Sequence, residues 1–398
     1  MSVAPAASTR ADRRALIAGG GSGGHVFPGL AVAAELERRG WKVAWAGRES
    51  GLEESLVTRR GLAFRALDAR PLVGRGVAGK VRSLATLAAS GLAARRLVQR
   101  ERARVVLGTG GYVSAPAVLG ARLAGVPALL LEPNANAGFA NRALSRLARE
   151  ALTAHPRTAR QLRCPATHTG VPVRAEFFDV AEDLPWGAPH KLLVLGGSQG
   201  AAKLNELLPG ALNALGRSHG PIVVRHQTGE RHLPAAREAY ARRGIHTVEV
   251  EGGGYRPDGP RVQVELVPFL HRMAGAMAES HLIVSRAGAI TLAEICAAGR
   301  PALLVPLRLA AGHQVYNARE LAQTGAAEVF EDEDASGEPG EETARGAGFA
   351  RLLGELLENR PRLAAMADAA RAMGRPGAAA HIADRLEDHA AGHAGRNS

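Results

Sequence analysis

Apolar and polar positions along the chain repeat one arrangement in both halves. In the first half, an apolar run ending near Ala18 leads into a glycine-rich turn, a segment with helical spacing and a second apolar run at 42–46. In the second half, apolar residues at 191–195 are followed by a glycine-rich turn, a helical pattern and an apolar run at 221–226. Short apolar runs that alternate with helical segments are typical of parallel strands buried on both faces. The pattern predicts an α/β protein in which each half opens a doubly wound parallel sheet.

The alternation continues in each half and is interrupted once. Segments 105–134 and 282–307 again give a strand, a glycine turn, a helix and a strand. Residues 171–190 lose this periodicity and contain three prolines (VPVRAEFFDVAEDLPWGAPH), as a linker between domains does. The expected divisions are a disordered leader at 1–12, a first domain at 13–172, a linker at 173–190 and a second domain at 191–372.

Composition narrows the class of protein. The 398 residues and the 46% hydrophobic content suit two globular domains. Only two cysteines, Cys164 and Cys296, are present, which disfavours a disulfide scaffold or a zinc site and suits a reducing cytoplasm. The leader lacks the apolar core of a signal peptide, and we expect no transmembrane segment.

The net charge of +12 has more than one interpretation. All but four of the 50 basic residues are arginine, which suggests a compositional bias and a generally basic surface. Aromatic residues make up 4% and are not interleaved with the arginines, so a nucleic-acid platform is disfavoured. A surface that meets anionic lipid or handles phosphates remains open.

The first glycine turn, GGGSGGH, has glycines at 19, 21 and 24 and therefore fits the dinucleotide fingerprint. That fingerprint needs an acidic residue after the second strand to hold a ribose. Here Arg48 would suit a 2′-phosphate, but Glu49 lies late, so an NADP-dependent oxidoreductase fits poorly. A phosphate cradle with His25 as a working group, or a structural turn, are the other interpretations.

The second glycine turn, GGSQG at 196–200, admits two functions. It matches the G-x-S-x-G elbow of hydrolases, but no acid–histidine pair for such a triad is marked in the chain, although Asp258 and later histidines exist. Glycines beside the Ser198 hydroxyl serve equally well to bind a phosphate.

The segment SRAGAITLAEICAAGRP at 285–301 is more specific. A strand ending near Val284 and a helix beginning near Ala289 would expose N–H donors to a diphosphate. Glu294, about one and a third turns further on, could accept hydrogen bonds from the vicinal diol of a ribose. The alternative is an ordinary exposed helix glutamate.

Three further segments carry polar groups at expected strand ends or helix starts. GTGGYVSAP at 108–116 is a glycine turn, and Glu132, Asn134 and Asn136 follow an apolar strand. AGHQVYNARELA at 311–322 opens a helix with amide side chains that suit sugar hydroxyls or a helix cap.

In order and spacing, these segments resemble the MurG family of peptidoglycan N-acetylglucosaminyltransferases, which convert lipid I to lipid II. The segments that carry the resemblance are GGGSGGHVFPGLAVA, GTGGYVSAP, the Asn134 segment, GVPVR at 170–174, GGSQGA, SRAGAITLAE and HQVYNA, between Leu16 and Arg375. Two positions depart from the family pattern: Ser22 replaces a threonine, and Val171 stands where an asparagine is common.

The resemblance implies a GT-B fold, in which two Rossmann-like domains face a cleft and a last helix at about 375–390 packs back on the first domain. It implies UDP-GlcNAc as donor, undecaprenyl-linked lipid I as acceptor, and a peripheral position on the anionic cytoplasmic face of the plasma membrane. Other cell-wall synthesis proteins are implied as partners, and nucleic acid is not. The alternatives are another GT-B UDP-sugar transferase or a UDP-GlcNAc 2-epimerase.

The resemblance also implies roles for individual residues. Glu294 would hold the ribose, Leu270 would meet the uracil through its backbone, and Ser198 would contact the donor phosphates. The implied donor-binding residues are Ser22, Gly23, Gly24, Asn134, Arg174, Ser198, Leu270, Ala289, Ile290, Thr291, Leu292, Ala293, Glu294 and Gln314. The implied acceptor-diphosphate residues are Gly21, Ser22, Gly23, Gly111 and Tyr112.

Transfer in this family inverts the anomeric centre, so the acceptor hydroxyl must lose a proton and the departing diphosphate must be stabilised. His25 is the candidate base, because imidazole titrates near neutral pH and a helix start keeps it neutral, and Glu132 is the reserve. A structural histidine is the alternative. No metal-binding Asp-x-Asp follows a strand, so we expect no obligatory cofactor or metal.

A membrane-contact surface is expected between residues 70 and 104, where apolar and basic side chains are interleaved. The apolar members are Leu72, Val73, Val77, Val81, Leu84 and Leu87, and the basic members are Arg75, Lys80, Arg82, Arg95, Arg96 and Arg100. A helix packed on its own core is the alternative.

Overall fold

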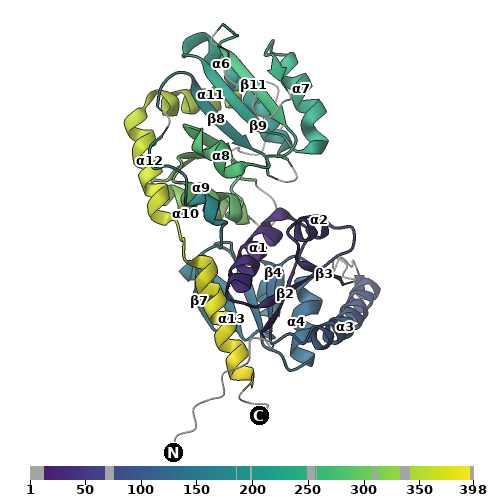
Figure 1. Ribbon diagram of the computed structural model, residues 1–398. Coiled ribbons are helices and arrows are strands. Elements are labelled where there is room, and N and C mark those ends of the chain that lie inside the picture. The colour runs from purple at the N-terminus through teal and green to yellow at the C-terminus, as the bar shows by residue number, and fades with distance from the viewer. Residues whose placement is uncertain are drawn as a thin grey trace, which may run out of the picture. The chain divides into compact units, whose positions relative to one another are not determined.

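The chain forms two compact units in the computed structural model (Figure 1). Unit 1 comprises Met1–Val173 and Arg375–Ser398, and unit 2 comprises Arg174–Gly374. The structure describes residues 13–67, 76–184, 186–197, 200–248, 256, 258–307, 312–331 and 341–394, without the side chains of 76–85, 341–345 and 394. The expected leader at 1–12 lies outside the described residues.

Unit 1 is a parallel sheet with the strand order β3-β2-β1-β4-β5-β6-β7. Its strands are β1 (Arg14–Gly19), β2 (Lys42–Gly47), β3 (Ala63–Ala66), β4 (Val105–Gly110), β5 (Ala128–Glu132), β6 (Glu150–Thr153) and β7 (Ala166–His168). Its helices are α1 (Gly23–Arg38), α2 (Leu52–Arg59), α3 (Gly76–Arg100), α4 (Ser114–Leu123), α5 (Phe139–Leu144), the 3₁₀ helix η2 (Pro156–Gln161) and α13 (Ala378–Ala394).

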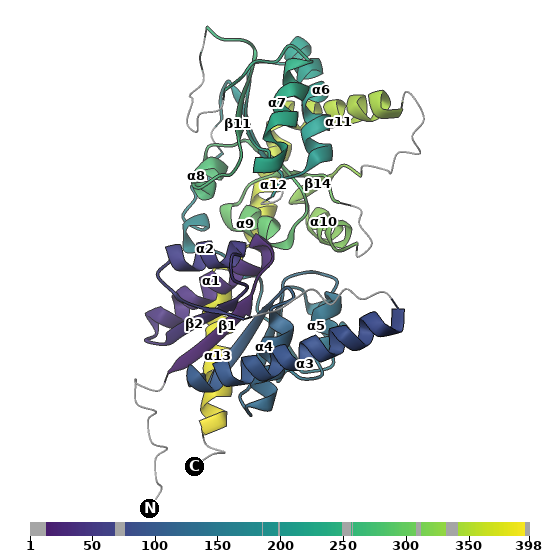
Figure 2. The ribbon, with the colours of Figure 1, turned by 90° about the vertical axis from the view of Figure 1, so that its right-hand side faces the viewer.

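Alternate residues of each strand in unit 1 enter two different cores. In β1, Ala15 and Ile17 pack on the side of α1 and α13, whereas Leu16 and Ala18 pack on the side of α3 and α4. Figure 2 shows α1 and α13 on one face of the sheet and α3 and α4 on the other. Because both faces are covered, the central strands β1, β4 and β5 are buried almost throughout, which explains the continuous apolar runs in the sequence.

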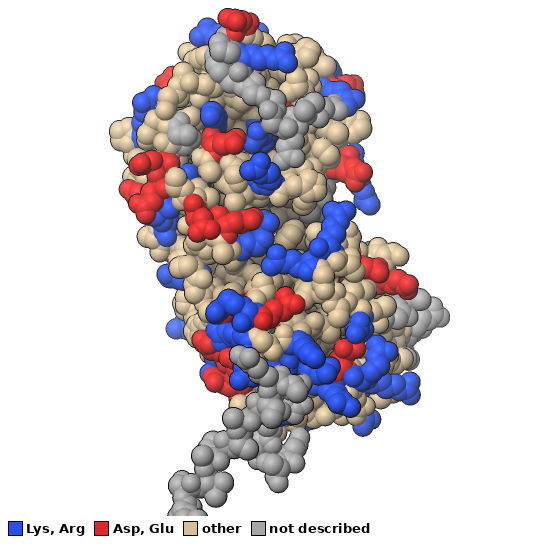
Figure 3. All heavy atoms as spheres, viewed as in Figure 1, with Lys and Arg blue, Asp and Glu red and all other residues tan. Residues whose placement is uncertain are grey.

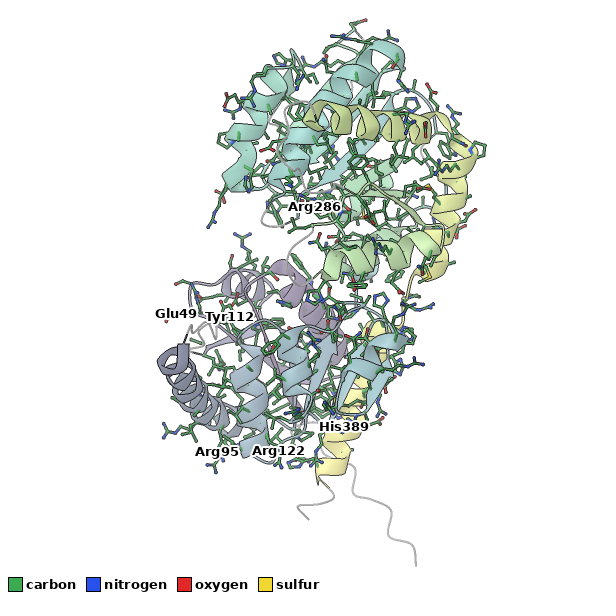
Figure 4. The ribbon with its side chains drawn as sticks, turned by 180° about the vertical axis from the view of Figure 1, so that it is seen from behind. Glu49, Arg95, Tyr112, Arg122, Arg286 and His389 are labelled. Atoms are coloured by element: carbon green, nitrogen blue, oxygen red, sulfur yellow. The ribbon has the colours of Figure 1, made fainter. Side chains whose placement is uncertain are left out.

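Helix α13 is fastened to unit 1 by its apolar side and by two groups of charges. Ile382 and Leu386 are buried in the core beside α1. Arg39 donates to Asp384 at 2.6 Å and to Glu387 at 2.8 Å. On β6, the buried Glu150 accepts hydrogen bonds from Arg385 at 3.0 Å and from His389 at 2.8 Å; His389 is labelled in Figure 4.

Unit 2 repeats the architecture with the order β10-β11-β9-β8-β12-β13-β14. Its strands are β8 (His190–Leu195), β9 (Ile222–Gln227), β10 (Thr247–Val248), β11 (Val262–Val267), β12 (Leu282–Ser285), β13 (Ala302–Leu304) and β14 (Ala327–Val329). Its helices are α6 (Ala202–Ser218), α7 (Leu233–Ala241), α8 (Met273–Ala278), α9 (Ala289–Ala298), α10 (His313–Gln323), α11 (Glu341–Glu358), α12 (Arg360–Met373) and the 3₁₀ helices η3 (Ala175–Phe177) and η4 (Glu230–His232).

The segment expected as a linker, 173–190, lies almost wholly inside unit 2. Phe177 is fully buried, and Val180 and Leu184 are also buried. The guanidinium of Arg300 donates to the carbonyl of Ala181 at 3.0 Å. Apart from η3, the described residues of 174–189 form turns and bends, yet these apolar side chains still pack into unit 2.

In each sheet the chain adds strands first on one side of its first strand and then on the other side. This switch falls between β1 and β4 in unit 1 and between β8 and β12 in unit 2. Loops that leave the carboxyl ends of such neighbouring strands diverge and form a crevice, where open α/β sheets bind ligands. The glycine-rich turns follow β1, β4, β8 and β12, so all four lie at the switch points.

Candidate functional site

The two glycine-rich turns of unit 1 interlock at its switch point. The Thr109 hydroxyl donates to the carbonyl of His25 at 2.7 Å, which ties the end of β4 to the start of α1. A Cβ at Gly110 would meet the His25 ring, and one at Gly111 would meet the carbonyl oxygen of Gly20. Glycine is therefore required where the two loops touch, and this close approach fixes the position of His25.

The His25 side chain makes one hydrogen bond that determines its tautomer. Its Nδ1 lies 3.2 Å from the carbonyl oxygen of Thr109. A carbonyl oxygen can only accept, so Nδ1 carries the proton and Nε2 holds a lone pair. Burial lowers the pKa of His25, while the Thr109 hydrogen bond and the charges of Glu132 and Glu53 oppose this. The ring is therefore neutral at pH 7, as a general base must be.

The first loop presents its remaining donors at the start of α1. The N–H of Gly21 is donated to the Glu53 carboxylate at 3.1 Å, so this predicted diphosphate contact is engaged inside unit 1. Ser22 is the N-cap of α1 and makes no side-chain capping bond within the described part of the unit. The first-turn N–H groups of Gly23 and Gly24 point along the helix dipole, which suits an anion.

Tyr112 and Gly111 continue the same edge from the loop after β4. Gly21 has a φ of +85°, and a Cβ there would lie 3.0 Å from the Tyr112 ring. Figure 4 shows Tyr112 and Glu49 near one edge of unit 1, where β4 and β2 end. The structure thus brings the predicted residues 21–25 and 111–112 together within unit 1.

Glu132 stands at the end of β5 and organises the loop that follows. Its Oε1 accepts hydrogen bonds from the backbone and side-chain amides of Asn134, each at 3.0 Å. Its Oε2 accepts from the Gly138 N–H at 2.8 Å and from the Asn141 amide at 2.9 Å. Four donors use the four lone-pair positions of a carboxylate. Both oxygens of Glu132 are therefore engaged within unit 1, and one of them holds the side chain of Asn134.

In unit 2, the glycine turn after β8 is held by the neighbouring strand β9. Gln227 donates its side-chain amide to the carbonyl of Gly197 at 3.0 Å, and the Gly196 N–H is donated to the Gln227 carbonyl at 3.1 Å. Ser198 lies outside the described residues. A Cβ at Gly200 would meet the carbonyl of Thr228, so this loop also needs glycine.

A buried polar network lies beneath this turn. His226 is fully buried, with Nδ1 3.0 Å from the Tyr240 hydroxyl and Nε2 3.0 Å from Asn205 Oδ1. The amide of Asn205 donates to the carbonyl of Thr228 at 3.2 Å. Burial lowers the pKa of His226 to about 3, so the ring is neutral, donating to Asn205 and accepting from Tyr240. The network fixes the backbone at Thr228, against which Gly200 packs.

The turn after β12 leads directly into α9, as the sequence predicts. The N–H of Leu292 is the first helix amide that bonds within α9, to the carbonyl of Gly288 at 3.0 Å. The N–H groups of Ala289, Ile290 and Thr291 therefore precede the helical ladder and are available to an anion. Arg286 precedes this helix, donates to the carbonyl of Val305 at 2.8 Å, and is labelled in Figure 4.

Glu294 lies on α9 and is 8% exposed. Its Oε1 is 3.8 Å from the guanidinium of Arg174, which also pairs with Glu176 at 3.0 Å. Burial raises the pKa of Glu294 to about 7, and the Arg174 charge offsets only part of that effect. Because Glu294 is buried, the alternative of an ordinary exposed helix glutamate does not hold.

The other predicted residues of unit 2 lie at the same edge of the sheet, at different strands. Leu270 follows β11 and is 3% exposed. Gln314, in the first turn of α10, accepts the Leu307 N–H on its side-chain oxygen at 3.0 Å. Asn317 donates to the carbonyl of Ala287 at 3.2 Å, which connects α10 to the turn before α9. Within the described residues, no group of three or more His, Cys, Asp or Glu side chains is placed to hold a metal ion.

Sequence reasoning missed the residues that hold the loops in place. Glu53, Thr109 and Gln227 all act on glycine turns through backbone groups. Thr109 lies inside a recognised motif, so a signal for it existed. Nothing in the sequence distinguishes Glu53 from its neighbour Glu54.

Comparison with known protein families gives two matches, one for each half. Residues 15–153 match the glycosyltransferase family 28 N-terminal domain, and residues 191–382 match the glycosyltransferase family 28 C-terminal domain. Two curated relatives carry the name UDP-N-acetylglucosamine–N-acetylmuramyl-(pentapeptide) pyrophosphoryl-undecaprenol N-acetylglucosamine transferase. The one from Pseudomonas putida F1 is 40% identical over 94% of this chain and 96% of its own length. The one from Halorhodospira halophila is 41% identical over 96% and 99%.

Solved structures agree with these matches. Acinetobacter baumannii MurG has a TM-score of 0.70 and 32% identity, covering 94% of this chain and 99% of its own. A structure described as a UDP-N-acetylglucosamine 2-epimerase from Listeria monocytogenes has a TM-score of 0.66 at 14% identity. That second likeness concerns the fold alone.

Proposed function

This chain belongs to the MurG family of N-acetylglucosaminyltransferases, and we propose that its unit 2 holds the UDP-GlcNAc donor while its unit 1 carries the base for the acceptor. The reaction is transfer of N-acetylglucosamine to lipid I, undecaprenyl-diphospho-MurNAc-pentapeptide, giving lipid II. The oxidoreductase and hydrolase interpretations of the glycine turns are superseded by this membership.

The donor is assigned to unit 2 because its switch point combines a diphosphate site with a diol site. The amides at 289–291 and the turn at 196–200 suit the diphosphate, and Ser198 is proposed to contact it. Glu294 is proposed to accept from the ribose hydroxyls, with Arg174 close enough to favour the ionised carboxylate. Leu270 and Gln314 are proposed to contact the uracil and the sugar. Ala293 and Leu292 complete this helix turn.

The observation that carries the mechanism is the hydrogen bond from His25 Nδ1 to the Thr109 carbonyl. It leaves Nε2 as the acceptor atom, and we assign that atom to the proton of the acceptor's 4-hydroxyl. As the proton moves to Nε2, the hydroxyl oxygen bonds to C1 of the donor sugar. The C1–O bond to UDP breaks, and its electron pair goes to the diphosphate. A base in such a position contributes roughly 10²–10⁴ in rate.

The departing UDP diphosphate is proposed to be stabilised by the N-terminus of α9, because positively polarised amides act on charge as it develops. The acceptor's own diphosphate is proposed to contact Ser22, Gly23, Gly111 and Tyr112 in unit 1, and Gly24 to lie on the donor side of the same helix start. Asn134, which Glu132 orients, is proposed to complete the sugar contacts. No protein-bound metal is required in this scheme.

A peripheral membrane surface is proposed for the end of unit 1 that carries α3 and α4. The expected residues at 70–75 lie outside the described part of the chain, and side chains are described only from 86 onward in α3. Leu92 is 51% exposed and Leu123 46% exposed. In Figure 4, Arg95 and Arg122 lie at the same outer edge, on two helices that pack together. Exposed apolar and basic side chains in one region suit an anionic bilayer.

Three further observations bear on that proposed membrane surface. Leu87 packs against the core of unit 1, so part of α3 serves the fold and not a membrane. On the face shown in Figure 3, basic and acidic side chains are interspersed. None of the described helices is both long and apolar enough to cross a membrane. Flotation with liposomes tests the proposal, which requires that binding increase with the fraction of anionic lipid.

The proposed function is tested with radiolabelled UDP-GlcNAc and a short-chain lipid I analogue. We expect label to enter the acceptor, with an inverted anomeric centre in the product. Conversion of UDP-GlcNAc in the absence of acceptor would instead support an epimerase. Absence of both activities in folded protein would contradict the function.

A further inference from the structure

The fully buried carboxylate of Glu53 is hydrogen-bonded to the first glycine turn. Glu53 lies in the first turn of α2 and is 0% exposed. Its Oε2 accepts the Gly21 N–H at 3.1 Å, and its Oε1 accepts the Arg48 N–H at 3.0 Å. Both oxygens act as acceptors, which is the pattern of an ionised carboxylate. One side chain therefore joins the turn after β1 to the turn after β2.

Three glycines make room for this carboxylate. A Cβ at Gly20 would meet its Oε1, a Cβ at Gly47 would lie 2.8 Å from its Cγ, and a Cβ at Gly51 would lie 2.7 Å from its Cδ. These glycines come from three different segments, after β1, at the end of β2 and before α2. The close packing holds the carboxylate in one place, so its charge is fixed relative to the loop.

The position explains why the dinucleotide fingerprint is misleading in this chain. Dinucleotide-binding folds use an acid after the second strand to bind a ribose. Here an acid does reach that edge of the sheet, but from α2, and its oxygens accept backbone amides of the loops. Because the Gly21 N–H already donates to Glu53, it is not available to a bound anion. The backbone N–H groups that the loop can offer an anion are those of residues 22–24 at the start of α1.

We propose that Glu53 is a positioning residue for the transfer reaction: it holds the 20–24 loop so that its anion site consists of the 22–24 amides, and it places a fixed negative charge near His25. The proposal rests on the role given to His25 and this loop under the proposed function.

The charges around His25 come from two elements packed against α1. Glu53 faces it from α2 and Glu132 from the end of β5, and both raise the pKa of His25 against the effect of burial. Tyr112 is the titratable group of the neighbouring β4–α4 loop. The Glu53 carboxylate therefore adds to the Thr109 hydrogen bond and the Glu132 charge in opposing the effect of burial on the imidazole.

Three variants separate charge from position. E53Q removes the charge, and its amide can accept from only one of the two N–H groups while its own NH₂ faces the other. E53D keeps the charge but is one methylene shorter, so it cannot reach both loops. E54Q is the matched control, since it removes the same charge from the adjacent residue, whose carboxylate accepts the Ser50 N–H.

For E53Q we expect kcat to fall roughly 10- to 100-fold, with the donor KM within twofold of wild type. The acidic limb of the kcat–pH profile should move to lower pH, because a negative charge near the base is lost. E53D should have a lower kcat than wild type, with the acidic limb of its kcat–pH profile at the wild-type position. E54Q should match wild type in kcat and in the position of the acidic limb.

A titration of His25 by NMR on ¹³C-histidine-labelled protein gives a readout that does not need activity. The pKa of His25 should be lower in E53Q than in E54Q and wild type. Equal His25 titration in all four proteins, or equal kcat in E53Q and E54Q, would overturn the proposal. Loss of thermal stability in E53Q and E53D without any movement of the pKa would assign Glu53 a structural role only, which also overturns it. An inactive wild type would instead contradict the proposed function, and an active His25→Ala variant would contradict the role given there to His25.

Discussion

Replacing Glu294 with glutamine should stabilise unit 2 while weakening donor binding. The wild-type carboxylate is 8% exposed, and its Arg174 partner is 3.8 Å away. Glutamine has nearly the same shape and no charge, so the variant removes the cost of burying an ionised group. It also removes an acceptor that two ribose hydroxyls could share.

The size of the stability effect follows from the raised pKa. The folded protein keeps the Glu294 proton up to a pKa of about 7, whereas the unfolded chain releases it near the ordinary glutamate pKa of 4.5. Folding stability contributed by this group therefore falls as pH rises from 4.5 to 7. At 1.36 kcal/mol per pKa unit, the ionised group costs the folded protein about 3 kcal/mol above pH 7. E294Q should avoid this cost, so its advantage should be largest at pH 8 and vanish near pH 4.5.

Donor affinity should change in the opposite direction. The wild-type protein should bind UDP-GlcNAc about tenfold less tightly at pH 6 than at pH 8, because a carboxyl with a pKa of about 7 is mostly protonated at the lower pH. E294Q should bind UDP-GlcNAc roughly 10- to 100-fold more weakly at pH 8, because it loses hydrogen bonds to a charged acceptor. Its affinity for UDP-GlcNAc should not depend on pH.

Isothermal titration calorimetry measures the affinities, and hydrogen exchange of the α9 amides measures local stability in a chain with two units. The conservative I295V variant, at a buried position of the same helix that is not among the proposed donor contacts, is a control for packing. The reasoning would be refuted if E294Q exchanged faster than wild type at pH 8, or if its UDP-GlcNAc affinity and pH dependence were those of wild type.

Four other outcomes are expected. Gly110→Ala should lower kcat by roughly 10² or more with UDP-GlcNAc affinity unchanged, because the Cβ would displace the His25 ring, and calorimetry with transfer kinetics would check both. Tyr240→Phe should leave His226 without its donor and cost about 1–3 kcal/mol of unfolding free energy, measured by urea denaturation, together with a higher donor KM. Burial raises the pKa of Glu150, but its hydrogen bonds to Arg385, Thr167 and His389 outweigh burial and lower the pKa overall. Glu150 should therefore stabilise α13 above pH 4.5 and lose this effect as the pH falls further. Faster amide exchange in α13 at low pH would show the loss. Transfer should persist in EDTA, and loss of turnover that manganese restores would contradict the metal-free scheme.

The alternation of strands, glycine turns and helices was predictable because parallel strands buried on both faces leave a clear pattern. The predicted helix start near Ala289 and the strand at 42–46 differ from α9 and β2 by a residue or less. The fold class is confirmed: the chain forms two parallel sheets and matches the structure of a GT-B glycosyltransferase. The resemblance to the MurG family is confirmed by relatives of about 40% identity over nearly the whole chain.

What could not be predicted depends on three-dimensional packing. Glu53 and Glu54 are adjacent and chemically identical, and the orientation of α2 in the folded unit determines that Glu53 is the buried one. The segment at 173–190 has the prolines and the irregular backbone of a linker, and the burial of Phe177 and Val180 comes from packing against the rest of unit 2. The predicted roles of the site residues remain predictions, although the tautomer of His25 and the burial of Glu294 support two of them.

The most direct test of the account is the rate of transfer to a lipid I analogue by His25→Ala, measured with and without added imidazole. The account predicts a kcat at least roughly 10²-fold below wild type, unchanged affinity for UDP-GlcNAc, and partial recovery of the rate by imidazole in its neutral form. A variant that transfers at the wild-type rate would contradict the assignment of the base to His25.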